Sequence, residues 1–190
     1  YATRPTTPDY SIRDLEVDCT GTSDGYGFYN CRNLTNCTGT GTGTSGRGFK
    51  NCTNLTNCTG TGTGTGTTGY GTGYGFRSCT NLTNCRGTGT GTTDGYGFDY
   101  CTNLTNCTGT GTETAVGYGF SVCTNLTNCT GKGTGTGTGY GFYDITTASN
   151  CRAGGESTTA MWGGINKNID LDTCRKTPVE VTSGELTTLN

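Results

Sequence analysis

The chain has 190 residues, a formal net charge of −2 and 36 Gly residues. Its charges are scattered, which excludes the basic footprint of a nucleic-acid partner or of an anionic membrane surface. No apolar run approaches the roughly 18 to 20 residues needed to span a bilayer, so we expect no membrane insertion. Because neither a start Met nor a signal sequence is present, we interpret the chain as a mature or excerpted region.

Hydrophobic residues make up only 29% of the chain. A Gly-rich chain with so few apolar residues is often disordered. Here, however, the apolar residues recur in a fixed register, which favours a solenoid whose stacked coils share a small core.

Residues 1–18 contain Pro5 and Pro8, followed by S-I-R-D-L-E-V-D. The alternation of Ile12, Leu15 and Val17 with charged neighbours predicts a strand with one solvated face. We interpret this segment as an N-terminal cap over the first open edge of the array.

Residues 19–151 form a tandem repeat, best seen in G-Y-G-F-D-Y-C-T-N-L-T-N-C-T-G-T-G-T from Gly95 to Thr112. The later Cys of each unit recurs after 18, 21, 27, 22, 22 and 22 residues, at Cys19, Cys37, Cys58, Cys85, Cys107, Cys129 and Cys151. The long spacing holds a Gly/Thr insertion around residues 67–72, which we expect to form a loop that leaves the stack intact.

Within each unit the expected inward residues are three apart, as in Phe98, Cys101, Leu104 and Cys107. This spacing predicts a tight 3₁₀-like turn that passes into a short strand. The predicted core ladder comprises Phe28, Phe49, Phe76, Phe98, Phe120, Phe142; Cys31, Cys52, Cys79, Cys101, Cys123; Leu34, Leu55, Leu82, Leu104, Leu126; and Cys37, Cys58, Cys85, Cys107, Cys129, Cys151. In the last unit Ile145 and Ala148 replace Cys and Leu, which supports inward positions there.

The 13 Cys residues allow two interpretations. They fit a secreted disulfide scaffold, and they equally fit columns of reduced, buried thiols. The odd total leaves at least one thiol unpaired within the chain.

After the second Cys, T-G-T-G-T places Thr on one face of a strand and Gly on the other. Because Gly is a poor strand residue, we expect its face to meet an opposing wall of the same coil too closely for a side chain.

Residues 152–190 leave the repeat and hold the only Met and the only Trp of the chain. We interpret them as a C-terminal cap or as a segment that joins a neighbouring chain, with Trp162 in the cap core in preference to a binding site.

The run F-x-x-C-x-x-L-x-x-C, preceded by G-Y-G, resembles the BspA-like leucine-rich repeat family. Phe98, Cys101, Leu104 and Cys107 match its Phe, Cys, Leu and first strand Ile, and the match covers most of residues 25–151. The T-G-T-G-T-G half departs from the family's aliphatic pattern. The resemblance implies a surface-exposed adhesion or recognition protein of bacteria, some protozoa or phages.

The first candidate binding face is the Thr array, with Thr40, Thr61, Thr88 and Thr110 at its centre. Stacked coils would form a flat lattice of hydroxyls and methyls that is similar to the T-x-T arrays of insect antifreeze proteins. Arg86 and Lys132 interrupt it. The competing interpretation is that Thr simply serves as a soluble strand residue beside Gly.

The second candidate face is the Tyr column, Tyr26, Tyr74, Tyr96, Tyr118 and Tyr140, with Arg47 in the second unit. We expect a Gly-rich turn to hold each Tyr near the surface, where it binds a sugar or protein partner or else packs over the turn. Asn columns such as Asn103 and Asn106 are expected to bond backbone groups in the turns. Their repeated N-L-T and N-C-T sequons favour a bacterial or phage origin.

No catalytic constellation emerges. His is absent, Asp170 and Asp172 fit a solvated face, C-x₅-C is not a usual zinc spacing, and the G-x-G strings lack the ending of a phosphate loop. We expect no enzyme activity, no metal and no cofactor.

The sequence therefore predicts an all-β, right-handed solenoid of stacked coils of about 22 residues, similar to leucine-rich repeats and capped at both ends. The expected function is non-enzymatic structural display or adhesion, extracellular on a bacterial surface, a secreted filament or a virion. The expected partner is a cell-surface protein or glycan, or a further copy of the chain. Ice binding through the Thr face and a self-assembling filament subunit are the alternatives.

Overall fold

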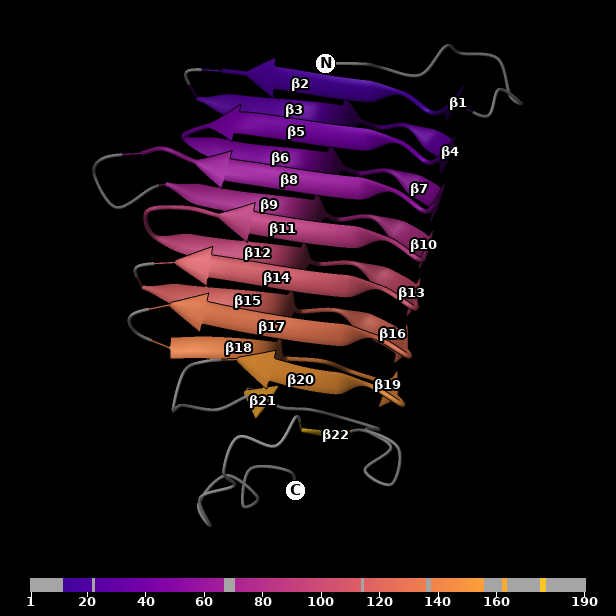
Figure 1. The fold of residues 1–190 in the computed structure, drawn as a ribbon, viewed down its shortest axis with the longest axis vertical. Coiled ribbons are helices and arrows are strands. Elements are labelled where there is room, and N and C mark those ends of the chain that lie inside the picture. Colours follow the sequence, from indigo (N-terminus) through magenta and orange to yellow (C-terminus); the bar gives the residue numbers. More distant parts are fainter. Residues whose placement is uncertain are drawn as a thin grey trace.

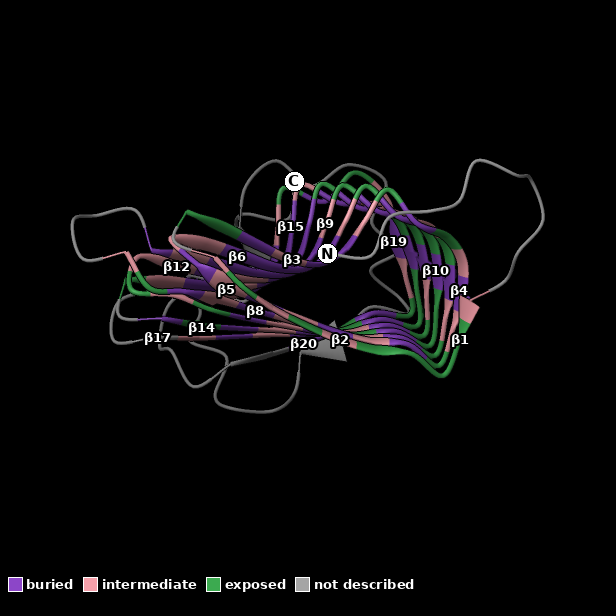
Figure 2. Cartoon of the chain, turned by 90° about the horizontal axis from the view of Figure 1, so that it is seen from above, coloured by how far each residue is buried: buried purple, intermediate pink, exposed green. Residues whose placement is uncertain are grey.

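The computed structural model describes residues 12–21, 23–66, 71–113, 115–135, 138–155, 162–163 and 175–176. Within these ranges every element is a β-strand, and the strands stack into three parallel sheets (Figure 1). The predicted β-solenoid is confirmed. Followed from the N terminus, the chain winds as a right-handed coil (Figures 1 and 2).

Each coil contributes one strand to each sheet, in the order T-N-L-T, T-G-T-G-T-G, G-Y-G-F. The Leu sheet contains β1 (Ile12–Arg13), β4 (Arg32–Thr35), β7 (Thr53–Thr56), β10 (Thr80–Thr83), β13 (Thr102–Thr105), β16 (Thr124–Thr127) and β19 (Ala148–Ser149). The Thr sheet contains β2 (Glu16–Thr20), β5 (Thr38–Gly43), β8 (Thr59–Gly64), β11 (Arg86–Thr90), β14 (Thr108–Glu113), β17 (Thr130–Gly135), β20 (Arg152–Gly155) and β22 (Arg175–Lys176). The Tyr sheet contains β3 (Asp24–Tyr29), β6 (Ser45–Lys50), β9 (Thr72–Arg77), β12 (Asp94–Asp99), β15 (Val116–Ser121), β18 (Thr138–Tyr143) and β21 (Trp162–Gly163).

The register places equivalent repeat positions directly above one another. Leu55 faces Leu82, and Leu82 faces Leu104. The insertion does not disturb the stack, because β8 and β11 on either side of it still pair in register from Thr59↔Arg86 to Thr63↔Thr90. Residues 67–70 of the insertion lie outside the described ranges.

The three-residue spacing of the core has a different cause from the expected 3₁₀-like turn, and that prediction was wrong. Asn30, Asn33 and Asn36 have φ values of 55°, 55° and 54°, in the left-handed region. Two extended residues followed by one left-handed residue bend the chain, so every third side chain points inward. Asn suits this place because its short polar side chain tolerates positive φ.

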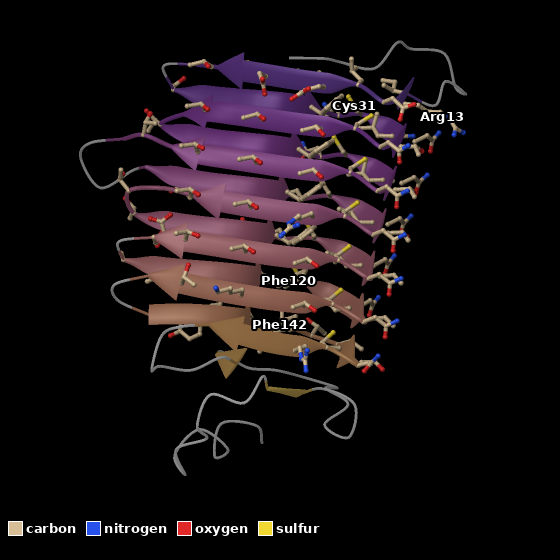
Figure 3. The ribbon with its side chains drawn as sticks, viewed as in Figure 1. Arg13, Cys31, Phe120 and Phe142 are labelled. Atoms are coloured by element: carbon tan, nitrogen blue, oxygen red, sulfur yellow. The ribbon has the colours of Figure 1, made fainter. Side chains whose placement is uncertain are left out.

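The core consists of single-residue ladders that run the length of the solenoid (Figure 3). The Phe rings from Phe28 to Phe142 stack with centroids 4.7–5.1 Å apart and planes within 7° of parallel. The Leu and Cys columns fill the rest of the interior, and Ile145 and Ala148 continue them with 0% and 1% exposure.

Among the described residues, the Cys columns are ladders of buried thiols, and Cys19 at their N-terminal end is half-buried. Many of these thiols lie within hydrogen-bond distance of backbone carbonyls; Cys58 Sγ, for example, donates to Leu34 O at 3.6 Å and to Thr56 O at 3.4 Å. Burial raises the pKa of the Cys79 and Cys123 thiols well above the ordinary value. The reduced, packed interpretation therefore describes these columns.

The Thr and Tyr sheets pack against each other through Gly, as expected from the T-G-T-G strands (Figure 2). A Cβ added at Gly41 would lie 2.1 Å from Arg47 O, and one added at Gly62 would lie 2.1 Å from Tyr74 O. The two backbones thus approach at a distance that excludes side chains, and the outer faces of these sheets point in opposite directions.

Strands pair with the stack on both sides of residues 19–151. β1 and β2 pair in register with β4 and β5, so residues 12–18 belong to the first coil. β20 continues the Thr sheet past Cys151, and β21 adds Trp162 opposite Phe142. The remainder of the expected caps, and the environment of the Trp162 side chain, lie outside the described residues.

Candidate binding surfaces

The Thr sheet carries three columns of Thr on its outer face. The middle column is Thr40, Thr61, Thr88 and Thr110, which face one another across successive strands, and Lys132 continues it. Arg86 interrupts the column that begins at Thr38. The third column runs from Thr42 through Thr63, Thr90 and Thr112 to Thr134.

The middle Thr side chains are half-buried, and their hydroxyls are open. Within the described part of the chain, no hydrogen bond to another protein group engages the hydroxyl of Thr40, Thr61, Thr88 or Thr110. In the third column, Thr134 Oγ1 donates to Gly111 O at 3.3 Å. β-Branched side chains are stiff at χ1, so these hydroxyls and methyls are pre-arranged on the strand.

The Tyr residues lie in strands of the Tyr sheet, and the expectation that a turn holds them was wrong. Tyr96 and Tyr118 stack with centroids 4.7 Å apart and planes 1° from parallel, and Tyr74 and Tyr140 extend the stack on either side. Because neighbouring rings cover each other's faces, the column offers ring edges and hydroxyls. Stacking of a sugar on ring faces, which the sequence suggested, does not suit the interior of this ladder.

Arg47 takes the Tyr place in the second unit. Its Cζ lies 5.1 Å from the Tyr26 ring centroid and 5.4 Å from that of Tyr74, so the guanidinium continues the stack by cation–π contacts. Arg47 Nη1 also donates to Asp24 Oδ1 at 2.9 Å.

A second column on this face follows each Phe and was missed by the sequence analysis. It reads Tyr29, Lys50, Arg77, Asp99, Ser121 and Tyr143. Its signal was the position after each Phe, where the residue type changes in every unit although the rest of the motif repeats.

Asp99 is the buried charge of that column, with 4% exposure. Burial raises the pKa of Asp99 to about 7, although Arg77 Nε lies 3.5 Å from its Oδ2 and opposes the shift. On the Thr sheet Glu113 stands at a Gly position, also buried, and its Oε1 accepts a hydrogen bond from Gly91 N.

The Leu sheet carries Asn ladders on its outer face (Figure 3). Asn54 Nδ2 donates to Asn33 Oδ1 at 3.0 Å, and Asn81, Asn103 and Asn125 continue the series at 2.9–3.0 Å. In the parallel ladder Asn36 Nδ2 donates to Asp14 Oδ1 at 3.0 Å, so a carboxylate accepts the first bond. The amides therefore bond one another across coils, and the expectation that they bond backbone groups was wrong.

Within the described ranges, no group of three or more Cys, Asp or Glu side chains could hold a metal ion. No helix there is long and apolar enough to cross a membrane. Asp170 and Asp172 lie outside the described residues. The prediction that the chain is not an enzyme remains a prediction.

Comparison of the chain with protein-family models, with curated proteins and with solved structures finds no match. The sequence and the geometry of the three faces are therefore the basis for the functional argument.

Proposed function

We propose that the chain is a non-enzymatic, extracellular structural or adhesion protein that presents its Thr face to a cell-surface glycan or protein. The setting we propose is a bacterial surface, a secreted filament or a phage fibre. The observation that carries the proposal is the middle Thr column, whose hydroxyls stand in register without protein partners among the described residues.

The three outer faces differ in how far their polar groups are used internally. Asn amides bond one another on the Leu sheet, and Tyr rings cover one another on the Tyr sheet. On the Thr sheet three adjacent Thr columns combine a repeating pattern with largely open hydrogen-bonding groups, whereas the Thr columns of the Leu sheet, such as Thr83 and Thr105, stand beside the Asn ladders. A ligand that binds on the Thr sheet has few hydrogen bonds within the protein to replace. The closely packed Gly backbones behind the Thr strands already hold these strands in place, so binding orders little further chain and the entropy cost is low.

The resemblance to BspA-like leucine-rich repeats supports the same proposal. Phe98, Cys101 and Leu104, which carry the resemblance, face the core of this chain. Members of that family look like surface-exposed adhesion or recognition proteins, and we propose the same role for this chain.

The experiment is binding of the purified chain to a glycan array and to bacterial and animal cells, with the double variant Thr61→Lys/Thr110→Lys. Because Lys132 already occupies this column, the variant should fold. The matched control is Thr105→Lys, the same change on the outer face of the Leu sheet. We expect at least a tenfold loss of binding in the double variant only; equal binding by all three proteins, or no binding anywhere, would contradict the proposal.

Ice binding is the second candidate, favoured by the spacing of the same lattice. Parallel strands lie about 4.8 Å apart, and alternate residues along a strand lie roughly 6.7 Å apart. Open hydroxyls and methyls at such intervals can order water into a sheet. Ice recrystallisation and thermal hysteresis separate the candidates, because an adhesin shows neither, whereas an ice binder loses both in Thr61→Lys/Thr110→Lys and keeps them in Thr105→Lys.

A further inference from the structure

Three cations gather around the Tyr column near the N-terminal end of the Tyr sheet. Arg47 lies between the rings of Tyr26 and Tyr74. From the neighbouring column, Lys50 Nζ lies 5.1 Å from the Tyr26 ring centroid, and Arg77 Cζ lies 4.4 Å from that of Tyr74. We call Tyr26, Arg47, Lys50, Tyr74 and Arg77 the cation–tyrosine patch.

Two carboxylates neutralise only part of this charge. Asp24 pairs with Arg47 at 2.9 Å, and Asp99 faces Arg77 at 3.5 Å. Lys50 has no carboxylate within 4.0 Å among the described residues; its Nζ donates to Tyr26 Oη at 3.5 Å. One positive charge therefore exceeds the acidic groups of the patch.

The patch also holds a polar atom that the protein leaves unused. Arg47 is 7% exposed, and its Nε has no hydrogen-bond acceptor. Burial lowers the pKa of Lys50, and repulsion from Arg47 and Arg77 lowers it further. An anion placed over Lys50 would relieve that repulsion and complete the charge balance.

We infer that the cation–tyrosine patch binds an oxoanion group, sulfate or carboxylate, carried by an acidic polysaccharide. Lys and Arg donors match such oxygens, and the Tyr hydroxyls beside them can bond sugar hydroxyls. The Tyr ladder continues beyond the patch through Tyr96, Tyr118 and Tyr140, which provides a line of ring edges along which an extended chain can lie.

Binding of a polyanion would depend on this patch and not on the charge of the whole chain. The chain as a whole has a net charge of −2, so a polyanion gains no general attraction to it. The patch lies on the outer face of the Tyr sheet, which points away from the Thr face. This inference therefore does not rest on the proposed function, and each can fail without the other.

The test is calorimetric titration of the intact chain with dextran sulfate, polygalacturonate and neutral dextran of matched length, at several salt concentrations. The key variant is Lys50→Gln, and Lys132→Gln on the Thr sheet is its matched control. Arg77→Gln provides a second variant if Lys50→Gln folds poorly. Circular dichroism checks the fold of each.

We expect binding of at least one polyanion, no binding of neutral dextran, and a loss of about fivefold or more in Lys50→Gln alone. The slope of log affinity against log salt should fall by about one in that variant, since one ion contact is lost. Binding of only one polyanion would support the inference and identify the oxoanion. The inference is overturned if neither binds, if Lys132→Gln loses as much, or if a single-stranded DNA oligonucleotide binds as tightly with the same dependence on Lys50.

Discussion

Gly62 offers a direct test of the close contact between the Thr and Tyr sheets. In Gly62→Ala the new Cβ would lie 2.1 Å from Tyr74 O, 2.4 Å from Tyr74 N and 2.5 Å from Gly46 O. Ordinary contacts of a Cβ begin at 3.4 Å, and all three atoms belong to the backbone, so no side chain can rotate away. One sheet must move locally by about 1 Å or more relative to the other.

Overpacking of this kind typically costs about 1–3 kcal/mol, and we expect the upper end because two hydrogen-bonded sheets must shift together. Elsewhere, Gly→Ala at a compatible position stabilises a protein by about 0.4–1 kcal/mol through the unfolded chain, so the predicted effect has the opposite sign. The assay is urea unfolding, with the neighbouring outward-facing Thr61→Ala as control. If Gly62→Ala unfolds within about 0.5 kcal/mol of Thr61→Ala, the close-contact argument is wrong.

Two further predictions concern buried ionisable groups. Burial raises the pKa of Asp99 to about 7 from its ordinary value of 3.8, so the folded state favours the protonated carboxyl. The contribution of this protonation to the free energy of unfolding is complete below pH 3.8 and is lost as the pH rises through about 7. This carboxyl is surrounded by Arg77, Arg47, Ser121, Cys101 and the neighbouring Tyr rings. We expect Asp99→Asn to flatten the decline in melting temperature between pH 5 and 8. An unchanged pH profile in that variant would contradict the prediction. Burial also keeps reagents away from the core thiols, so iodoacetamide should label the half-buried Cys19 first and the core Cys residues only on unfolding, as peptide mass spectrometry can show; rapid native labelling of Cys79 would refute this.

The core could be predicted from the sequence because the repeat leaves few alternatives. Phe98, Cys101 and Leu104 recur at the same interval in unit after unit, and a stack of identical coils places each on its own kind. The Gly face followed from the same logic, since Gly is stable in a strand only where another backbone replaces its missing side chain.

The local backbone could not be predicted, because a spacing of three has more than one solution. A 3₁₀ turn and a repeated extended–extended–left-handed pattern both place every third residue inward, and the observed pattern requires positive φ even at Val122. The Asn residues that favour the second solution were visible in the sequence. The signal lies in the tolerance of Asn for left-handed φ, which is separate from the bonding of its side chain.

The residues of the outer columns explain why the two proposed sites suit different ligands. Inside the solenoid a replacement must keep an apolar volume, as Ile145 and Ala148 do. Outside, the Thr columns repeat almost unchanged, whereas the column of Lys50, Arg77 and Asp99 changes in every coil. A surface that repeats suits a ligand that repeats, because affinity then grows with the number of coils engaged. A surface that varies marks one place on the array, so the Thr face suits a periodic partner, and the cation–tyrosine patch suits a single charged group that fixes the register of a longer chain.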